Sequence, residues 1–247
     1  MRNISTIAFV IVVFSICNLT VKGQTPENKS GKKVYTQSVS DLLFGFSDCV
    51  DTANHALKNG VRTTYVFNYG QFLHIDVSNA LGFVTGLSVR NVGIKTFDET
   101  IQNFEYDKVK RRVFALGGSF AVKAGSFSNH SFVYAGGEYE MAFHYRQKLY
   151  AKSSNKLEKQ GEWLSSATQR FLPSVFVGYQ LPSNFNFQVK YYFDDFLNHS
   201  YKGDLGDFTV FKKSQLICLA ISYQINKSKG ESSILEKLEE KKGTFDL

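Results

Sequence analysis

The stretch NFNFQVKYYFD, residues Asn184 to Asp194, alternates strictly between two kinds of side chain. One face carries Phe185, Phe187, Val189, Tyr191 and Phe193, and the other carries Asn184, Asn186, Gln188, Lys190, Tyr192 and Asp194. A period of two is that of a β-strand with one apolar and one polar face. The stretch therefore predicts a strand between two different environments, and the same pattern recurs along most of the chain.

The alternation predicts about eight strands, which is the size of the smallest outer-membrane barrels. They are Val39–Ser47, Arg62–Ser78, Leu81–Phe97, Val109–Ala124, Ser131–Tyr150, Ala167–Gln180, Asn184–Leu197 and Phe208–Ile225. Long connections (Asp48–Val61, Asp98–Lys108, Ala151–Ser166 and Asn198–Asp207) alternate with short ones (Asn79–Ala80, Gly125–His130 and Leu181–Ser183). An even strand number with alternating loop lengths is typical of a single up-and-down antiparallel transmembrane β-barrel.

The two ends of the 247-residue chain differ from its middle. Residues 1–23 are typical of a signal peptide, with Arg2, an apolar core from Ile7 to Leu19 and a small-residue cleavage site at Val21–Gly23. A membrane anchor is the alternative, but the apolar run is shorter than the roughly 20 residues that a spanning helix needs. We expect a flexible periplasmic leader at 24–38, the barrel at 39–226 and a charged periplasmic tail at 227–247, either frayed or a short helix.

The direction of the two faces follows from the residues opposite the apolar ones. A soluble lipocalin-like barrel also alternates, but its outer surface needs dense Lys and Glu to stay in solution. Here the polar face is rich in small residues that suit a narrow interior, among them Gly82, Gly86, Ser88, Ala115, Gly117, Ser119, Gly136, Gly178, Ala220 and Ser222. The bulky apolar face is therefore expected to contact lipid, and the protein to reside in an outer membrane.

Charged and histidine side chains on the polar face are then expected inside the barrel. They are Asp41, His74, Asp76, Arg90, Lys123, Glu138, Glu140, His144, Arg146, Lys190 and Asp194. Both signs occur in similar number, so the groups can pair and fill the lumen as a plug. A narrow channel for small solutes or ions along the same network is the alternative.

The sequence offers only weak candidates for catalysis. His144 with Glu140, and His74 with Asp76, could supply an acid–base pair to a lipid-modifying enzyme, but neighbours two or four apart on one strand lie roughly 7 to 14 Å apart. His199-Ser200 lies in a predicted loop without an obvious acid. No phosphate loop, CxxC or metal-ligand spacing is present, so we expect a non-catalytic protein without a cofactor.

The partners that the sequence favours belong to a cell surface. The net charge is +7, with mild basic clusters at Lys108–Arg112 and Lys152–Lys159 that are either solvated loop charges or attract anionic lipid or polysaccharide. No nucleic-acid motif accompanies them. Outer-membrane lipid and lipopolysaccharide should surround the barrel, and the outer loops could bind a surface polysaccharide or a protein. Expected membrane-interface aromatics are Tyr65, Tyr145, Tyr150, Trp163, Tyr179 and Tyr201.

Several runs resemble the uncharacterised outer-membrane β-barrel proteins of Bacteroidota. They are Ser40–Asp48 (SDLLFGFSD), Phe72–Asp76 (FLHID), Gly86–Gly93 (GLSVRNVG) and Lys190–Phe193 (KYYF), together with Gln24 after the signal peptide. The resemblance extends from Val39 to Ile225 and implies a barrel in the outer membrane, without an activity or functional residues to transfer. The chain departs from many such barrels by continuing past Ile225, which places an expected assembly signal near Ile221–Tyr223.

Overall fold

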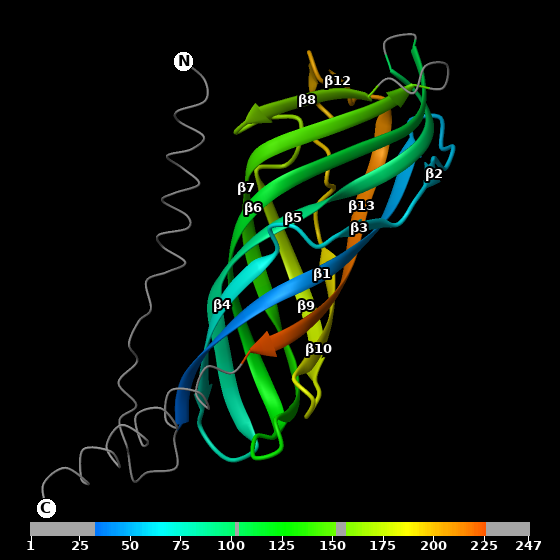
Figure 1. The fold of residues 1–247 in the computed structure, drawn as a ribbon. Coiled ribbons are helices and arrows are strands. Elements are labelled where there is room, and N and C mark those ends of the chain that lie inside the picture. Colours follow the sequence, from blue (N-terminus) through cyan, green and yellow to red (C-terminus); the bar gives the residue numbers. More distant parts are fainter. Residues whose placement is uncertain (1–32, 102–103, 152–156, 226–247) are drawn as a thin grey trace, which may run out of the picture.

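The computed structural model describes residues 33–101, 104–151 and 157–225, and these form a tall barrel of β-strands (Figure 1). The expected signal peptide, residues 24–32 of the leader and the tail at 227–247 lie outside the described residues. Within the described ranges, no helix is long and apolar enough to cross a membrane.

Eight strands close into a ring by antiparallel pairing. In ring order they are β1 (Lys33–Asp51), β4 (Tyr69–Asp76), β5 (Leu81–Ile101), β6 (Phe104–Ser126), β7 (Ser131–Ala151), β9 (Phe171–Gln180), β10 (Phe185–Tyr192) and β13 (Phe211–Ile225). The ring closes where β1 pairs with β13, from Ser38 opposite Ile225 to Asp51 opposite Phe211. The predicted antiparallel barrel of eight strands is confirmed.

Five short strands lie outside this ring order. They are β2 (Lys58–Asn59) on β5, β3 (Arg62–Thr64) on β1, β8 (Leu157–Trp163) on β7, and the pair β11 (Lys202–Gly203) and β12 (Gly206–Asp207). They lie toward one end of the barrel, which we call the extended end, where β5, β6 and β7 continue beyond their neighbours (Figure 1).

The other end, which we call the turn end, holds the short connections (Figure 1). Backbone hydrogen bonds close these turns, from Val77 N to Leu81 O at 3.0 Å and from Leu181 N to Phe185 O at 2.8 Å. Both β1 and β13 also have their chain-terminal ends here (Figure 1). Within the described residues, the long connections between ring strands therefore lie at the extended end, as the alternating connection lengths predict.

Strand β10 shows the two-faced pattern that its sequence predicts. Phe185, Phe187, Val189 and Tyr191 are exposed, whereas the residues between them are buried inside the barrel. Outward side chains on neighbouring strands are of the same kind, among them Leu87, Phe120, Tyr139, Val177 and Ile217. The middle of the barrel thus carries an apolar band on its outside and polar side chains within.

Some predicted boundaries are wrong. Residues 33–38 belong to β1 and pair with β4, so the leader expected at 24–38 ends earlier. The strand expected at Arg62–Ser78 is two strands, because the chain leaves the sheet between β3 and β4 with Phe67 at a φ of 61°. Asn68 fixes this break, since its side-chain amide donates to the carbonyls of Asp41 and Thr64. The loop expected at Ala151–Ser166 contains β8, and much of that expected at Asp98–Lys108 is strand.

A β-bulge in β7 changes which side chains point inward. Phe114 pairs with His144 and Ala115 with Ala142, so Phe143 has no partner on β6. One extra residue shifts a period-two pattern by one position. Below the bulge Glu138 and Glu140 point into the barrel, and above it Tyr145 and Gln147 do so instead.

Candidate functional site

A network of five charged side chains fills the middle of the lumen. Arg90 on β5 pairs with Asp41 on β1, and its Nε lies 3.6 Å from Glu138 and 3.9 Å from Glu140 on β7. Lys190 on β10 pairs with Glu138 and lies 3.3 Å from Glu140. All five are nearly fully buried. Buried charges persist only when they are paired, so the network locks strands from four parts of the ring together.

A second network occupies the lumen near the turn end. The Lys123 ammonium lies 2.6 Å from Asp76 and donates to His74 Nδ1 at 3.2 Å and to the Tyr35 hydroxyl at 3.0 Å. The imidazole of His74 stacks on the ring of Tyr35, with centroids 4.8 Å apart. Because Lys123 is fully buried, these contacts replace all of its hydration.

The extended end is closed by the segment that leads into β13. Phe196, Leu197, Leu205, Phe208 and Phe211 are buried there against the inner faces of β5, β6 and β7. Beside this cap, the guanidinium of Arg111 makes two hydrogen bonds to Glu99, at 2.6 and 2.8 Å. The same guanidinium lies 5.3 Å from the ring centroids of both Phe208 and Phe211. One buried ion pair thus joins β5 to β6, and its guanidinium contacts the aromatic rings of the cap.

We expect the cap to loosen in acid. Burial alone would raise the pKa of the Glu99 carboxyl, but Arg111 and the hydrogen bond from Thr96 hold that pKa below its ordinary value of 4.5. Stability from a lowered carboxyl pKa is full above the ordinary value and is lost as pH falls through the folded value. Hydrogen exchange in residues 195–211 should therefore rise below pH 4.5, after correction for intrinsic rates. In the Glu99→Gln variant this step should vanish, and an unchanged step would contradict the assignment.

A small cavity lies inside the lumen, and a larger hollow opens at the extended end. A lumen cavity of about 40 Å³ beside His74 and Glu138 has room for a few water molecules. A larger hollow of about 610 Å³ opens at the extended end, but its acidic side chains have cationic partners, Asp98 with Lys58 and Asp207 with Lys202. Across the described ranges, no three His, Cys, Asp or Glu side chains group as metal ligands.

The acid–base pairs considered from sequence do not form. His144 and Glu140 lie on opposite faces of β7, because the bulge separates them. His74 and Asp76 are both bound to Lys123 in a buried site. The arrangement therefore leaves neither histidine paired with a carboxylate that a substrate could reach.

The structure does bring a serine, a histidine and an aspartate together within the segment from Asp195 to Ser214. His199 Nε2 lies 3.0 Å from the Ser214 hydroxyl, and His199 Nδ1 lies 3.9 Å from Asp195. The Ser214 hydroxyl is fully buried and accepts a hydrogen bond from Leu197 N at 3.0 Å. A nucleophile must reach its substrate, so this cluster fastens the cap to β13 and does not catalyse acyl transfer.

Three of the residues expected in the lumen lie elsewhere. His144 and Arg146 point outward because of the bulge at Phe143, and Asp194 is exposed because β10 ends at Tyr192. The remaining expected residues are buried within the ring, namely Asp41, His74, Asp76, Arg90, Lys123, Glu138, Glu140 and Lys190. Glu99 and Arg111 are also buried, although the sequence predicts a loop at Glu99 and a surface cluster of basic residues at Arg111.

The expected interface aromatics lie in different surroundings. Tyr65 and Trp163 near the extended end and Tyr179 near the turn end are exposed on the outside. Tyr145 is buried, again because of the bulge, and Tyr201 is half-buried against the cap, with its ring centroid 5.3 Å from that of Phe208. Tyr150 lies beside the Lys108 ammonium, 4.4 Å from its ring centroid. Tyr145 is therefore not an interface anchor.

The outer face of β5, β6, β7 and β8 changes character toward the extended end. Above the apolar band lies an aromatic row in which the rings of Phe114, Phe143, His144 and Trp163 contact one another. The next row across the strands is Gly93, Arg112, Arg146 and Gly161. The row after it is Lys95, Lys110, Lys148 and Lys159. We call the six cations of these two rows the cationic ladder.

Comparison with known proteins assigns no family to the chain. No protein-family model and no curated protein matches the chain. Among solved structures, the chain is similar to Ail, the attachment invasion locus protein of Yersinia pestis, solved in complex with the heparin analogue sucrose octasulfate. The identity is 11%, the alignment covers 76% of this chain and 99% of Ail, and the TM-score is 0.34. The chain is also similar to the outer-membrane channel DcaP of Acinetobacter baumannii, with an identity of 9% and a TM-score of 0.19. That alignment covers 80% of this chain and 99% of DcaP. The fold assignment therefore rests on the strand pairing described above.

Proposed function

We propose that the protein is an integral outer-membrane barrel with a filled lumen, which acts by binding at its extended end and not by transport or catalysis. The observation that carries this proposal is the inversion of polarity across one wall of strands. Charged groups such as Arg90 and Glu138 are buried inside, and rings such as Phe120 and Phe187 are exposed outside. This is the arrangement that a lipid-facing barrel requires.

The outer apolar band argues against a soluble barrel. Exposed large hydrophobic side chains occur on seven of the eight strands of the ring; examples are Phe46, Leu87, Leu116, Tyr139, Val175, Val189 and Ile217. On β4 the apolar side chains Leu73 and Ile75 are half-buried. A continuous surface of this kind in water would aggregate. The resemblance of the Ser40–Asp48 and Gly86–Gly93 runs to outer-membrane barrels of Bacteroidota agrees with this location. We infer that the turn end faces the periplasm, because short turns do so in such barrels.

The filled lumen argues for binding over transport. The Arg90 and Lys190 network crosses the middle of the barrel, the Lys123 network fills the region near the turn end, and the cap closes the other end. An ion would have to displace paired buried charges at two levels, which costs several kcal/mol each. The groups left accessible to a partner are those on the outer surface of the extended end.

We expect the purified protein to insert into bilayers and yet to leave them electrically silent. It should sediment with the outer-membrane fraction and show a heat-modifiable band, as a stable membrane barrel does. In planar bilayers it should give no single-channel steps, with an open porin as the positive control. Steady conductance from the inserted protein would favour the narrow-channel alternative, and recovery in the soluble fraction would overturn the membrane location.

A further inference from the structure

The cationic ladder concentrates like charges on one outer face. Its lysine row places Lys95, Lys110, Lys148 and Lys159 directly opposite one another on four adjacent strands. Facing residues in a sheet lie about 5 Å apart, and like charges at that separation are destabilising. Burial and the neighbouring cations Lys108 and Lys95 accordingly lower the pKa of Lys110. Repulsion within this row therefore lowers the stability of the free protein, and a bound polyanion would remove that repulsion.

The ladder also lacks internal counter-charges. Neither of its two rows contains a carboxylate among the residues paired across β5, β6, β7 and β8. In the described part of the chain, none of its six cations forms an ion pair, and Arg112 Nε is buried without a hydrogen-bond partner. Lysines elsewhere at the extended end do pair, as Lys58 does with Asp98 and Lys213 with Asp48. The ladder is thus a cationic surface left for an external anion.

Below the ladder, on the same strands, lies a hollow in the apolar band. This glycine groove, of about 590 Å³, runs between Leu87, Phe120, Tyr139 and Val175 over Gly118 and Gly137. A Cβ added at Gly118 would approach no atom closer than 3.9 Å, and one added at Gly137 none closer than 3.6 Å. Packing therefore does not require glycine at either position, and the missing side chains create the groove.

The positions of the two features match one lipid molecule. Gly118 lies six residues below Arg112 along β6, which is about 20 Å of strand, or about 14 Å of depth at a tilt near 45°. That is close to half the thickness of a bilayer core. Between them lies the row of Phe114, Phe143, His144 and Trp163, and aromatic side chains mark the boundary with the headgroups.

We propose that the ladder binds the headgroup of a glycolipid with more than one phosphate in the outer leaflet, and that the glycine groove holds one of its acyl chains. The inference rests on the proposed membrane location and names the partner of the extended end. Phosphates between Lys110, Lys148 and the two arginines would accept charge-assisted hydrogen bonds from both rows. A soluble polyanion could bind the ladder but has no acyl chain to place in the groove. Dependence of binding on the groove therefore distinguishes a lipid headgroup from a soluble polyanion as the source of phosphate.

The test uses the full mature chain in neutral detergent micelles, titrated with bisphosphorylated lipid A, with dephosphorylated lipid A, and with inorganic polyphosphate. Trp163, the only tryptophan of the chain, lies beside the ladder and reports binding by its fluorescence. The double variant Lys110→Gln/Lys148→Gln should weaken binding of bisphosphorylated lipid A about tenfold or more, since each cation near an anionic surface adds about one half to one decade. Dephosphorylated lipid A should bind at least tenfold more weakly than the bisphosphorylated form.

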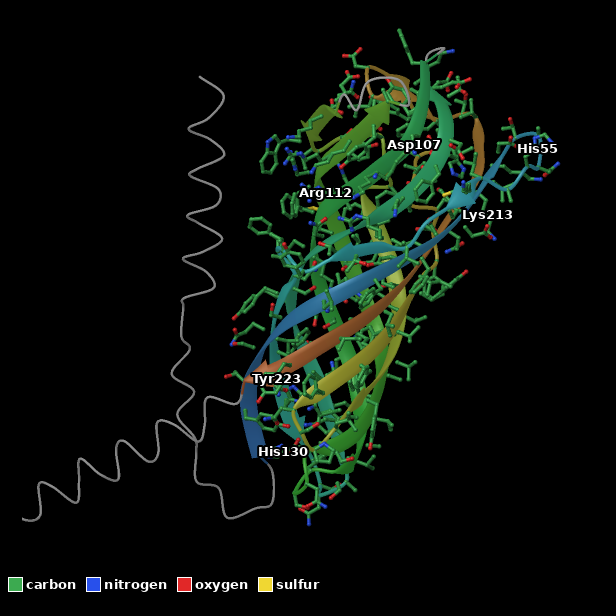
Figure 2. The ribbon with its side chains drawn as sticks, turned by 45° about the vertical axis from the view of Figure 1, so that its right-hand side comes forward. His55, Asp107, Arg112, His130, Lys213 and Tyr223 are labelled. Atoms are coloured by element: carbon green, nitrogen blue, oxygen red, sulfur yellow. The ribbon has the colours of Figure 1, made fainter. Side chains whose placement is uncertain are left out.

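The matched control is Lys212→Gln/Lys213→Gln, which removes the same charge from β13 on the opposite side of the ring. Figure 2 shows Arg112 and Lys213 on opposite sides of the extended end. This control should change affinity less than twofold. Filling the groove with Gly118→Leu/Gly137→Leu should weaken binding of the lipid severalfold and leave binding of polyphosphate unchanged.

Two results would overturn the inference. One is equal affinity of the ladder variant and its control for bisphosphorylated lipid A. The other is tight, ladder-dependent binding of polyphosphate with no effect of the groove variant on the lipid, which would identify a soluble polyanion as the ligand. Each variant is also scored for its heat-modifiable band. Failure of the wild-type chain to insert into membranes would refute the proposed membrane location. If the wild-type chain inserts normally and the ladder and groove variants bind bisphosphorylated lipid A as it does, only the lipid site is refuted.

Discussion

Replacing Lys190 by methionine should destabilise the barrel by about 3–5 kcal/mol, because it leaves buried carboxylates without their cation. Lys190 is the cation nearest to both Glu138 and Glu140, and Arg90 is already shared with Asp41. Methionine fills nearly the same volume, so the loss reflects charge and not a cavity. Urea unfolding of the refolded protein in micelles, followed by the heat-modifiable band, measures the change.

Two further variants isolate the cause. Lys213→Met removes a lysine that is about half exposed and pairs with Asp48 on the surface, and it should cost at most about 1 kcal/mol. Adding Glu138→Gln to Lys190→Met should restore part of the stability, because one buried charge is removed along with its partner. Equal losses from Lys190→Met and Lys213→Met would show that the lumen network does not hold the strands together.

The sequence predicts the ring because its signal is repeated and local. In β10 every second residue from Phe185 to Tyr191 is apolar, and each of those side chains is exposed on the outer face. Pairing of such a strand in the wrong register by one residue would turn all its rings inward, so the pattern fixes both the strand and its orientation. Short turns at Asn79–Ala80 and Leu181–Ser183 then leave antiparallel neighbours as the available topology.

The features that could not be predicted from the sequence depend on pairing between residues that are distant in the chain. The bulge at Phe143 has no local mark, yet it reverses the direction of Arg146 and Tyr145. Strand β8 is absent from the prediction because its residues LEKQGEW lack apolar alternation; it forms through pairing with β7 alone. The alternation of Arg62–Ser78 continues through Tyr65–Asn68, where the hydrogen bonds of Asn68 interrupt the strand.

The candidate site is invisible in the sequence for the same reason. Lys95, Lys110, Lys148 and Lys159 come from four segments, and two basic clusters were the only hint of them. Registers across three strand pairs bring them into one row. The glycine groove likewise needs Gly118 and Gly137 on neighbouring strands. The composition of the chain indicates its positive charge, but only the register of the strands shows that the charged side chains form one surface.

Placing arginine at position 189 should test the orientation of the barrel in lipid most directly. Val189 is exposed near the middle of the apolar band, opposite Leu219 on β13 and Val177 on β9. Arginine at the midplane of a membrane barrel costs about 2–4 kcal/mol, because its charge lies in hydrocarbon. Val189→Arg should therefore lower the unfolding free energy by that amount in phospholipid vesicles.

The same substitution at Val210 provides the comparison, since Val210 is exposed to a similar degree in the segment before β13 at the extended end. If that end lies outside the bilayer, Val210→Arg should change stability by no more than about 0.5 kcal/mol. A soluble barrel would tolerate both substitutions equally, because each arginine would be solvated. Equal small effects at positions 189 and 210 would thus refute the membrane location, whereas a cost confined to position 189 places the apolar band in lipid.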